Sequence, residues 1–202
     1  MNILSLSHLP SSNMSYQTYT TEALVCGSKD SYTSDRSYLL FTERAGMLWA
    51  AARSVREERS RQRYALQEFS LVRVSLVRGK TGWRIGSVTA LNNAYHSSPE
   101  RQTRGAVTKI FRLLRQYLHG EDAPPAIFSD TRAVLSRLAK DGRECDAVLD
   151  LFTLRFLYHL GYIAPHSSYQ SLIDGNELPT DVSILSSEAR RAITQAGDVS
   201  HL

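Results

Sequence analysis

The densest group of chemically useful side chains is the segment RSVREERSRQR, residues 53–63, which carries five arginines and two glutamates. From Arg53 to Arg84 the sequence has nine basic and three acidic residues. Guanidinium groups contact phosphate oxygens through paired hydrogen bonds, and such contacts release the counterions condensed on a polyanion. We therefore predict that nine cations form a nucleic-acid-binding surface: Arg53, Arg56, Arg59, Arg61, Arg63, Arg73, Arg78, Lys80 and Arg84.

Two conformations of the arginine segment are consistent with its sequence. In the first, it is a solvated helix, because Arg56, Arg59 and Arg63 lie at helical spacing and Glu57 pairs with Arg61 at i,i+4. Such a helix would have almost no apolar side and would be marginally stable. In the second, it is a mobile basic loop beside a sheet, with its guanidinium groups available to the phosphates of a nucleic acid.

Aromatic residues near these cations could stack on bases. Tyr64, Trp49 and Trp83 are the candidates. We expect Trp49 to pack in the core instead, and the sequence leaves both roles open for Trp83. Arg36 is expected to form a structural ion pair with its neighbour Asp35.

Charge is distributed unevenly along the 202 residues, which have a formal net charge of +4. Up to Gly120 there are 17 basic and 8 acidic residues, whereas beyond it there are 7 basic and 12 acidic residues. A basic first part favours polyanionic partners, although two ordinary solvated surfaces would give the same totals. No apolar run is long enough to span a bilayer, and residues 1–15 do not resemble a secretory signal. Since Cys26 and Cys145 suggest neither a disulfide framework nor a zinc site, we expect a reducing cytoplasm. With the predicted nucleic-acid-binding surface, we expect the protein to associate with the nucleoid there.

Short apolar runs separated by turn residues predict five strands in the first half of the chain. They are residues 19–27, 36–42, 47–54, 67–77 and 83–91. In the third run, alternation places Met47, Trp49 and Ala51 on one side and Leu48, Ala50 and Ala52 on the other. Five strands with a long middle connection predict a small barrel or sandwich, and a closed barrel has no exposed edges.

The apolar spacing becomes helical after this region. We predict helices at residues 98–120, 124–142, 145–162 and 186–197, the first of them capped by Ser98. The third is apolar on nearly every side and should be the buried centre of the helical part. The predicted fold class is α+β, with an N-terminal five-stranded barrel of the oligonucleotide-binding (OB) type and a C-terminal helical domain. The predicted ranges are a flexible leader at 1–17, the barrel domain at 18–95 and the helical domain at 96–202.

Several pieces of the sequence, taken in order, resemble the RecO family of bacterial recombination mediators across residues 18–165. YTTEALVCG at 19–27 is similar to the family's first strand, and SDRSYLLFTERAGMLWAAARS at 34–54 to the run that follows it. The basic connection and the motif LQEF at 66–69 resemble the family's entry into the next strand. FTLRFLYHLGYIAP at 152–165 is close to the family helix that ends in Leu-Gly-Tyr.

The resemblance implies binding to single- and double-stranded DNA, annealing of complementary strands, and loading of recombinase onto strands coated by single-strand binding protein. It implies RecR and the acidic tail of single-strand binding protein as partners, and no catalytic residue. The sequence departs from the family at two points. Many members have a zinc-binding cysteine cluster where residues 166–181 here contain no cysteine, so we expect no metal or other cofactor. Ser54 stands where the family usually has glycine.

Two other classes of function compete with DNA binding. A protein adaptor would use its basic residues to dock acidic peptides, and Arg101, Arg104, Lys109, Arg112 and Arg115 on the first helix fit that role as well as they fit DNA. A nuclease would need clustered carboxylates for metal ions, whereas the acidic residues here are scattered. His159 lies on the apolar helix and is expected to be a packed core residue, not a ligand.

Overall fold

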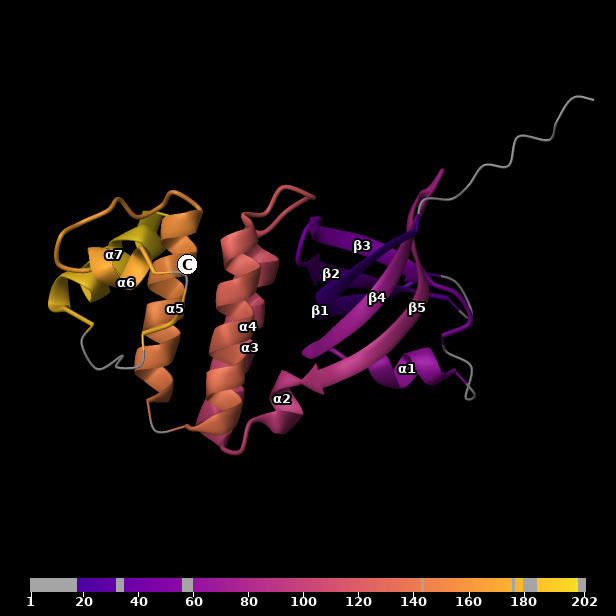
Figure 1. The fold of residues 1–202 in the computed structure, drawn as a ribbon, viewed down its shortest axis with the longest axis horizontal. Coiled ribbons are helices and arrows are strands. Elements are labelled where there is room, and N and C mark those ends of the chain that lie inside the picture. Colours follow the sequence, from indigo (N-terminus) through magenta and orange to yellow (C-terminus); the bar gives the residue numbers. More distant parts are fainter. Residues whose placement is uncertain are drawn as a thin grey trace, which may run out of the picture.

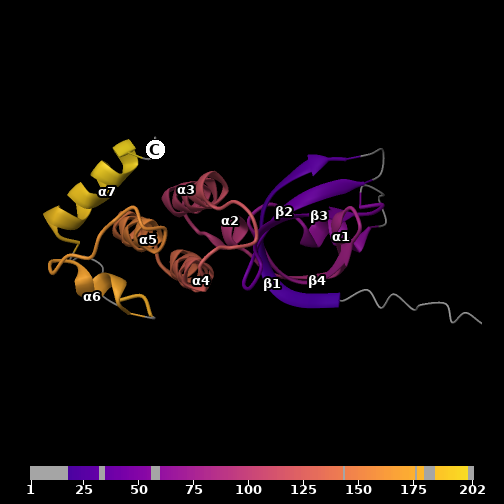
Figure 2. The same cartoon turned by 90° about the horizontal axis from the view of Figure 1, so that it is seen from above.

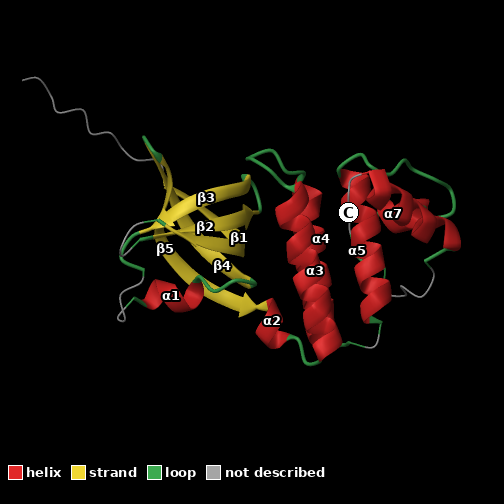
Figure 3. Ribbon diagram, turned by 180° about the vertical axis from the view of Figure 1, so that it is seen from behind, coloured by secondary structure: helices red, strands yellow, loops and turns green. Residues whose placement is uncertain are grey.

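The computed structural model describes residues 18–31, 35–55, 60–142, 144–175, 177–179 and 185–199. Its first part is a barrel of five strands, on the right of Figure 1 and in yellow in Figure 3. The strands are β1 (Thr18–Asp30), β2 (Arg36–Thr42), β3 (Gly46–Ala52), β4 (Ser70–Gly79) and β5 (Gly82–Asn93). They close in the order β1-β2-β3-β5-β4, and the β3–β5 pair is parallel while the other pairs are antiparallel.

The alternation predicted for the strands is confirmed in the barrel core. Val72, Val74 and Leu76 on β4 are buried inside the barrel, as are Leu48 and Ala50 on β3. Outward residues occupy the positions between them. The predicted architecture, an OB-type barrel followed by a helical region, is confirmed, while the predicted domain boundaries remain predictions and the leader at 1–17 lies outside the described residues.

The basic connection between β3 and β4 is not one continuous helix. Val55, its single aliphatic residue, is 1% exposed and packs in the barrel core. A short helix, α1 (Arg61–Ala65), begins only after Ser60, whose backbone is extended, and Leu66 behind it is buried in the same core. A single helix over residues 53–63 is therefore wrong, because the described residues 53–55 form a turn and Ser60 is extended.

The remaining elements are helical. They are α2 (Ala94–Ser97), α3 (Arg101–Tyr117), α4 (Pro125–Lys140), α5 (Cys145–His159), α6 (Gln170–Ile173) and α7 (Ser187–Val199). The predicted cap at Ser98 is wrong, since Ser98 is the C-cap of α2 and its Oγ donates a hydrogen bond to the carbonyl of Ala94, the first residue of that helix. Glu100 is the N-cap of α3, and its side chain and that of Thr103 form a reciprocal capping box.

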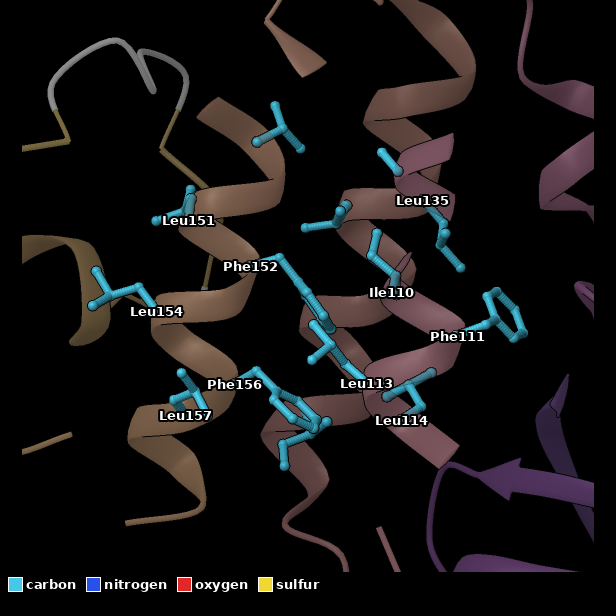
Figure 4. Packing of buried hydrophobic residues seen from close by; sticks show 14 of the residues in the cluster. Ile110, Phe111, Leu113, Leu114, Leu135, Leu151, Phe152, Leu154, Phe156 and Leu157 are labelled. Carbon is cyan, nitrogen blue, oxygen red and sulfur yellow. The ribbon is translucent and has the colours of Figure 1, made fainter. Parts of the chain in front are cut away.

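Helix α5 is the centre of the helical part, as predicted from its sequence. It lies between α3 and α4 on one side and α6 and α7 on the other (Figures 1 and 2). Leu151, Leu154 and Leu157 are fully buried, and Phe152 and Phe156 are 1% exposed. The close-up in Figure 4 shows the two phenylalanines pointing toward the helices beside them, where Ile110 and Leu113 of α3 lie.

The barrel and the helices share one hydrophobic core. Leu24, Cys26, Phe41 and Met47 lie on the outer face of the barrel and belong to the same buried cluster as the helices. Phe41, for example, packs edge-to-face on Phe128 of α4 with ring centroids 5.3 Å apart. The two parts are therefore joined by packed apolar side chains.

Polar contacts reinforce this junction. Arg132 Nη1 of α4 lies 2.7 Å from Glu22 Oε2 of β1, and the Met47 amide donates to the Gly120 carbonyl at 2.9 Å. Arg115 of α3 donates to the Cys26 carbonyl at 2.8 Å and also pairs with Glu68. No helix among the described residues combines the length and apolarity needed to cross a membrane.

Gly105 destabilises α3, and no neighbouring atom requires a glycine there. Gly105 lies in the helix interior, is exposed, and a Cβ placed on it would meet no atom within 4 Å. Glycine inside a helix is less favourable than alanine by about 1 kcal/mol. We expect Gly105→Ala to raise the free energy of unfolding in urea by about that amount. Destabilisation instead would mean that this face of α3 is already covered by another molecule or segment.

Candidate nucleic-acid interface

Three of the predicted cations lie around the end of β3. Arg53 is exposed in the turn after β3, and Arg63 is exposed on α1. Arg84 on β5 pairs with Ala51 on β3, and Ala51 lies two residues before Arg53 in the sequence. Gln62 of α1 donates to the Gly86 carbonyl of β5 at 3.4 Å, which holds the helix against that strand. The fold thus brings Arg53, Arg63 and Arg84 to one region of the barrel surface, which we call the barrel-end cluster.

A small cavity of about 320 Å³ opens beside this cluster and is lined by Arg36, Tyr38, Val55 and Arg63. Arg36 Nε donates to Asp30 Oδ1 at 2.9 Å, and this hydrogen bond raises the pKa of Arg36. Burial raises the pKa of the Tyr38 hydroxyl. The cavity wall therefore keeps its arginine charged and its phenol neutral.

The predicted pair between Arg36 and Asp35 is wrong. Asp35 Oδ1 instead accepts a hydrogen bond from the Ser54 amide at 3.0 Å, which fixes the turn after β3. Ser54 has a φ of +51°, in the left-handed region that favours glycine. This conformation gives a physical reason for the glycine that the RecO resemblance places at this position.

The hairpin between β4 and β5 carries two further predicted cations. Lys80 is exposed in its turn. Arg78 is directed toward the helices, because its Nη1 lies 3.6 Å from Glu121 Oε2 and its guanidinium is 5.2 Å from the Trp83 ring centroid. Glu121 therefore offsets part of the positive charge that the sequence assigned to this hairpin.

Arg73 lies apart from the barrel-end cluster. Its Nη2 is 3.5 Å from Glu22 Oε1 on β1, and Glu22 also pairs with Arg132 of α4. Arg73 thus belongs to the side of the barrel that faces the helices. Arg56 and Arg59 lie outside the described residues, and Arg61 is described only as the first residue of α1.

The two tryptophans have opposite environments. Trp49 is 42% exposed on the outer face of β3, so the expectation that it packs in the core is wrong. Trp83 packs partly against the barrel core and donates from Nε1 to Glu121 Oε1 at 2.9 Å. Tyr64 on α1 is 69% exposed.

Lys29 is a cation that the sequence-based set did not include. Its Nζ lies 4.2 Å from the centroid of the Trp49 ring. Alternation counted from the inward residues Ala23 and Val25 would turn Lys29 into the barrel. A β-bulge between Val25 and Gly27 shifts the count by one residue and puts Lys29 on the outer face.

A buried ionic cluster lies in the helical part. Arg155 Nε donates to Asp130 Oδ2 at 2.8 Å, and His159 Nε2 lies 3.3 Å from the same oxygen. These residues line a cavity of about 900 Å³ between α4, α5 and α6. Among the described residues no group of three or more His, Cys, Asp or Glu side chains is arranged to hold a metal ion.

The family comparison covers the barrel. Residues 14–93 match the family model described as "Recombination protein O N terminal". The similar curated proteins extend further along the chain. A protein from Desulfitobacterium hafniense named "DNA repair protein RecO" is 28% identical over 146 residues, which is 71% of this chain and 52% of that protein.

A second relative with the same name, from Syntrophobacter fumaroxidans, is 27% identical over 148 residues, which is 73% of this chain and 58% of that protein. This chain therefore spans a little over half the length of the relatives it matches. The family-model match includes all five strands, and the 146 to 148 residues matched by the relatives are more than the barrel contains, so those matches include helical residues. The barrel of this chain is therefore similar to the N-terminal domain of the RecO family, and the similarity to proteins named "DNA repair protein RecO" extends over 71–73% of the chain.

Proposed function

We propose that this protein binds DNA through the cations of its barrel and acts in recombinational repair as a mediator that anneals complementary strands. In this role it would also help to load recombinase onto single strands coated by single-strand binding protein. The observation that carries the proposal is the barrel-end cluster: Arg53, Arg63 and Arg84 gathered on the RecO-type barrel. We assign it no catalytic residue, cofactor or metal.

Annealing follows from the electrostatics of such a surface. Two complementary strands repel each other through their phosphates, and cations that neutralise one strand lower that repulsion. Arginine suits this role because it contacts phosphate through two donors and stays charged. The whole predicted set, including Arg56, Arg59, Arg61, Arg73, Arg78 and Lys80, is proposed to extend the contact.

We also propose RecR and the acidic tail of single-strand binding protein as partners. Helix α3 supports an acidic partner, since its sequence has five cations and no acidic residue. An adaptor that binds only acidic peptides is the competing function. Titration with an oligonucleotide and with an acidic peptide separates the two, because the adaptor alone would bind the peptide and leave the oligonucleotide free.

The direct test is the salt dependence of DNA binding by the triple variant Arg53→Ala, Arg63→Ala, Arg84→Ala. Each lost phosphate contact should lower the slope of log K against log salt by about 0.7 to 0.9. We therefore expect the slope to become shallower by about 2 to 3, together with loss of strand annealing. The measurement is fluorescence anisotropy of a labelled oligonucleotide at several salt concentrations.

The matched control removes arginines from the far end of the molecule. Arg190 and Arg191 lie on α7, where Arg190 Nε is 3.5 Å from Asp150. The variant Arg190→Ala, Arg191→Ala should retain the wild-type slope. A triple variant that binds with wild-type affinity and slope would show that DNA does not contact the barrel-end cluster.

A further inference from the structure

We infer that Trp49 is a stacking platform for an unpaired base, so that a single strand crosses the outer face of the barrel beside α3. This inference rests on the proposed DNA binding and specifies its ligand as single-stranded nucleic acid. Its starting point is an exposed indole in an otherwise apolar sequence, GMLWAAA, where the neighbouring outward residue Met47 is covered by the helices. The helices thus cover one end of this face and leave Trp49 uncovered.

Strand register defines what surrounds the indole. Gly27, Leu39 and Trp49 form one row across β1, β2 and β3. Lys29, Ser37, Ala51 and Arg84 form the next row, which continues onto β5. Within its own row Trp49 has only Leu39 and the side-chain-free Gly27 beside it, and the indole is 42% exposed, so a planar base can reach it from solvent. The ammonium group of Lys29 lies over the ring, so a base stacking on that side would displace it.

Cations lie on both sides of the platform. Lys29 Nζ is 4.2 Å from the ring centroid, and Arg84 lies on the strand next to β3. On the opposite side, Arg115 of α3 approaches Gly27, with its Cδ 4.0 Å from the position of a Cβ on that glycine. Arg112, one turn earlier on α3, is exposed.

Adjacent strands are about 4.8 Å apart, so Gly27 beneath Arg115 and Trp49 are separated by about 10 Å. A strand running from Arg112 over Trp49 to Arg84 would therefore meet a cation before and after the stacked base. Asp30, which follows Lys29, pairs with Arg36, and Glu68 pairs with Arg115, so both of these carboxylates are already engaged. A duplex hides its bases and could use the cations alone, which is why the indole points to a single strand.

The test uses the fluorescence of Trp49, isolated by the background substitution Trp83→Phe. Saturation with oligo-dT should quench this emission, whereas heparin, a polyanion without bases, should bind and leave it unchanged. Trp49→Ala should weaken oligo-dT binding by about 5- to 100-fold, the range expected for loss of one stacked base. Trp49→Phe should retain most of the affinity, and heparin affinity should stay within about twofold in both variants.

The outcomes separate this inference from the proposed function. If oligo-dT binds with its normal salt dependence but neither quenches Trp49 nor responds to Trp49→Ala, the platform is wrong and DNA binding stands. If the folded wild-type protein binds no oligonucleotide at low salt, both are wrong. Equal quenching by heparin, or quenching by an acidic peptide alone, would also overturn the platform. If Trp83→Phe does not fold, the emission of Trp49 is obtained by subtracting the emission of Trp49→Phe from that of the wild-type protein, with and without oligo-dT.

Discussion

Gly46→Ala is expected to lower the free energy of unfolding by about 2 to 4 kcal/mol, because the added methyl group would collide with the backbone of the loop between α3 and α4. Gly46 has a φ of +58°, which costs an alanine about 1 to 2 kcal/mol. Its Cβ would also lie 2.8 Å from both the Gly120 carbonyl oxygen and the Glu121 carbonyl carbon. Neither atom can rotate away, since both belong to the backbone of the loop that follows α3.

The clash should be visible as a local change as well as a loss of stability. The Met47 amide donates to the Gly120 carbonyl, and Trp83 donates to Glu121 in the same loop. Moving this loop away from β3 would expose the Trp83 indole, so its emission should shift to the red in Gly46→Ala.

Gly120→Ala is the matched control. Gly120 also has a positive φ, of +78°, but a Cβ there would meet nothing within 4 Å. It should cost about 1 to 2 kcal/mol and leave the Trp83 emission unchanged. Equal costs for the two substitutions, measured by urea denaturation, would show that the close approach at Gly46 contributes nothing.

Asp130→Asn is expected to destabilise the protein by about 3 to 5 kcal/mol, since it leaves the buried charge of Arg155 uncompensated. The side chains of Arg155 and Asp130 are 3% and 5% exposed. Arg155 also donates to the Leu172 carbonyl at 3.0 Å and to the Gly175 carbonyl. These bonds tie the segment around α6 to α5, so amide hydrogen exchange in α6 should accelerate in the variant.

Asp150→Asn supplies the comparison for this prediction. Asp150 pairs with Arg190 at 3.5 Å, where the side chains are 39% and 61% exposed, and such pairs contribute less than about 1 kcal/mol. Similar denaturation midpoints for Asp130→Asn and the wild-type protein would contradict the view that the Arg155 charge depends on Asp130.

The strands were predictable because their apolar residues alternate with a period of two, and the buried α5 because it is apolar on nearly every side. The pairing that closes the barrel was not, since β3 and β5 meet through residues more than thirty positions apart in sequence. The start of α3 was misassigned because Ser98 and Glu100 both have capping side chains, and only the reciprocal bond with Thr103 distinguishes them.

The arginine-rich character of the candidate site was readable from composition, but its layout was not. Arg73 and Arg78 have acidic partners, Glu22 and Glu121, that no sequence spacing connects to them. The environment of Trp49 was misjudged for a related reason. Met47 and Trp49 point to the same side of β3, and only the placement of the helices decides that one is covered and the other exposed.

The core shared between the two parts has a consequence for the barrel on its own. Without the helices, the barrel would expose an apolar patch to water that is prone to aggregation. The patch consists of Leu24, Cys26, Phe41 and Met47. We therefore expect the barrel without its helices to self-associate through that patch. Any replacement for the helices must supply its own counterparts of Phe111 and Phe128 to cover that patch.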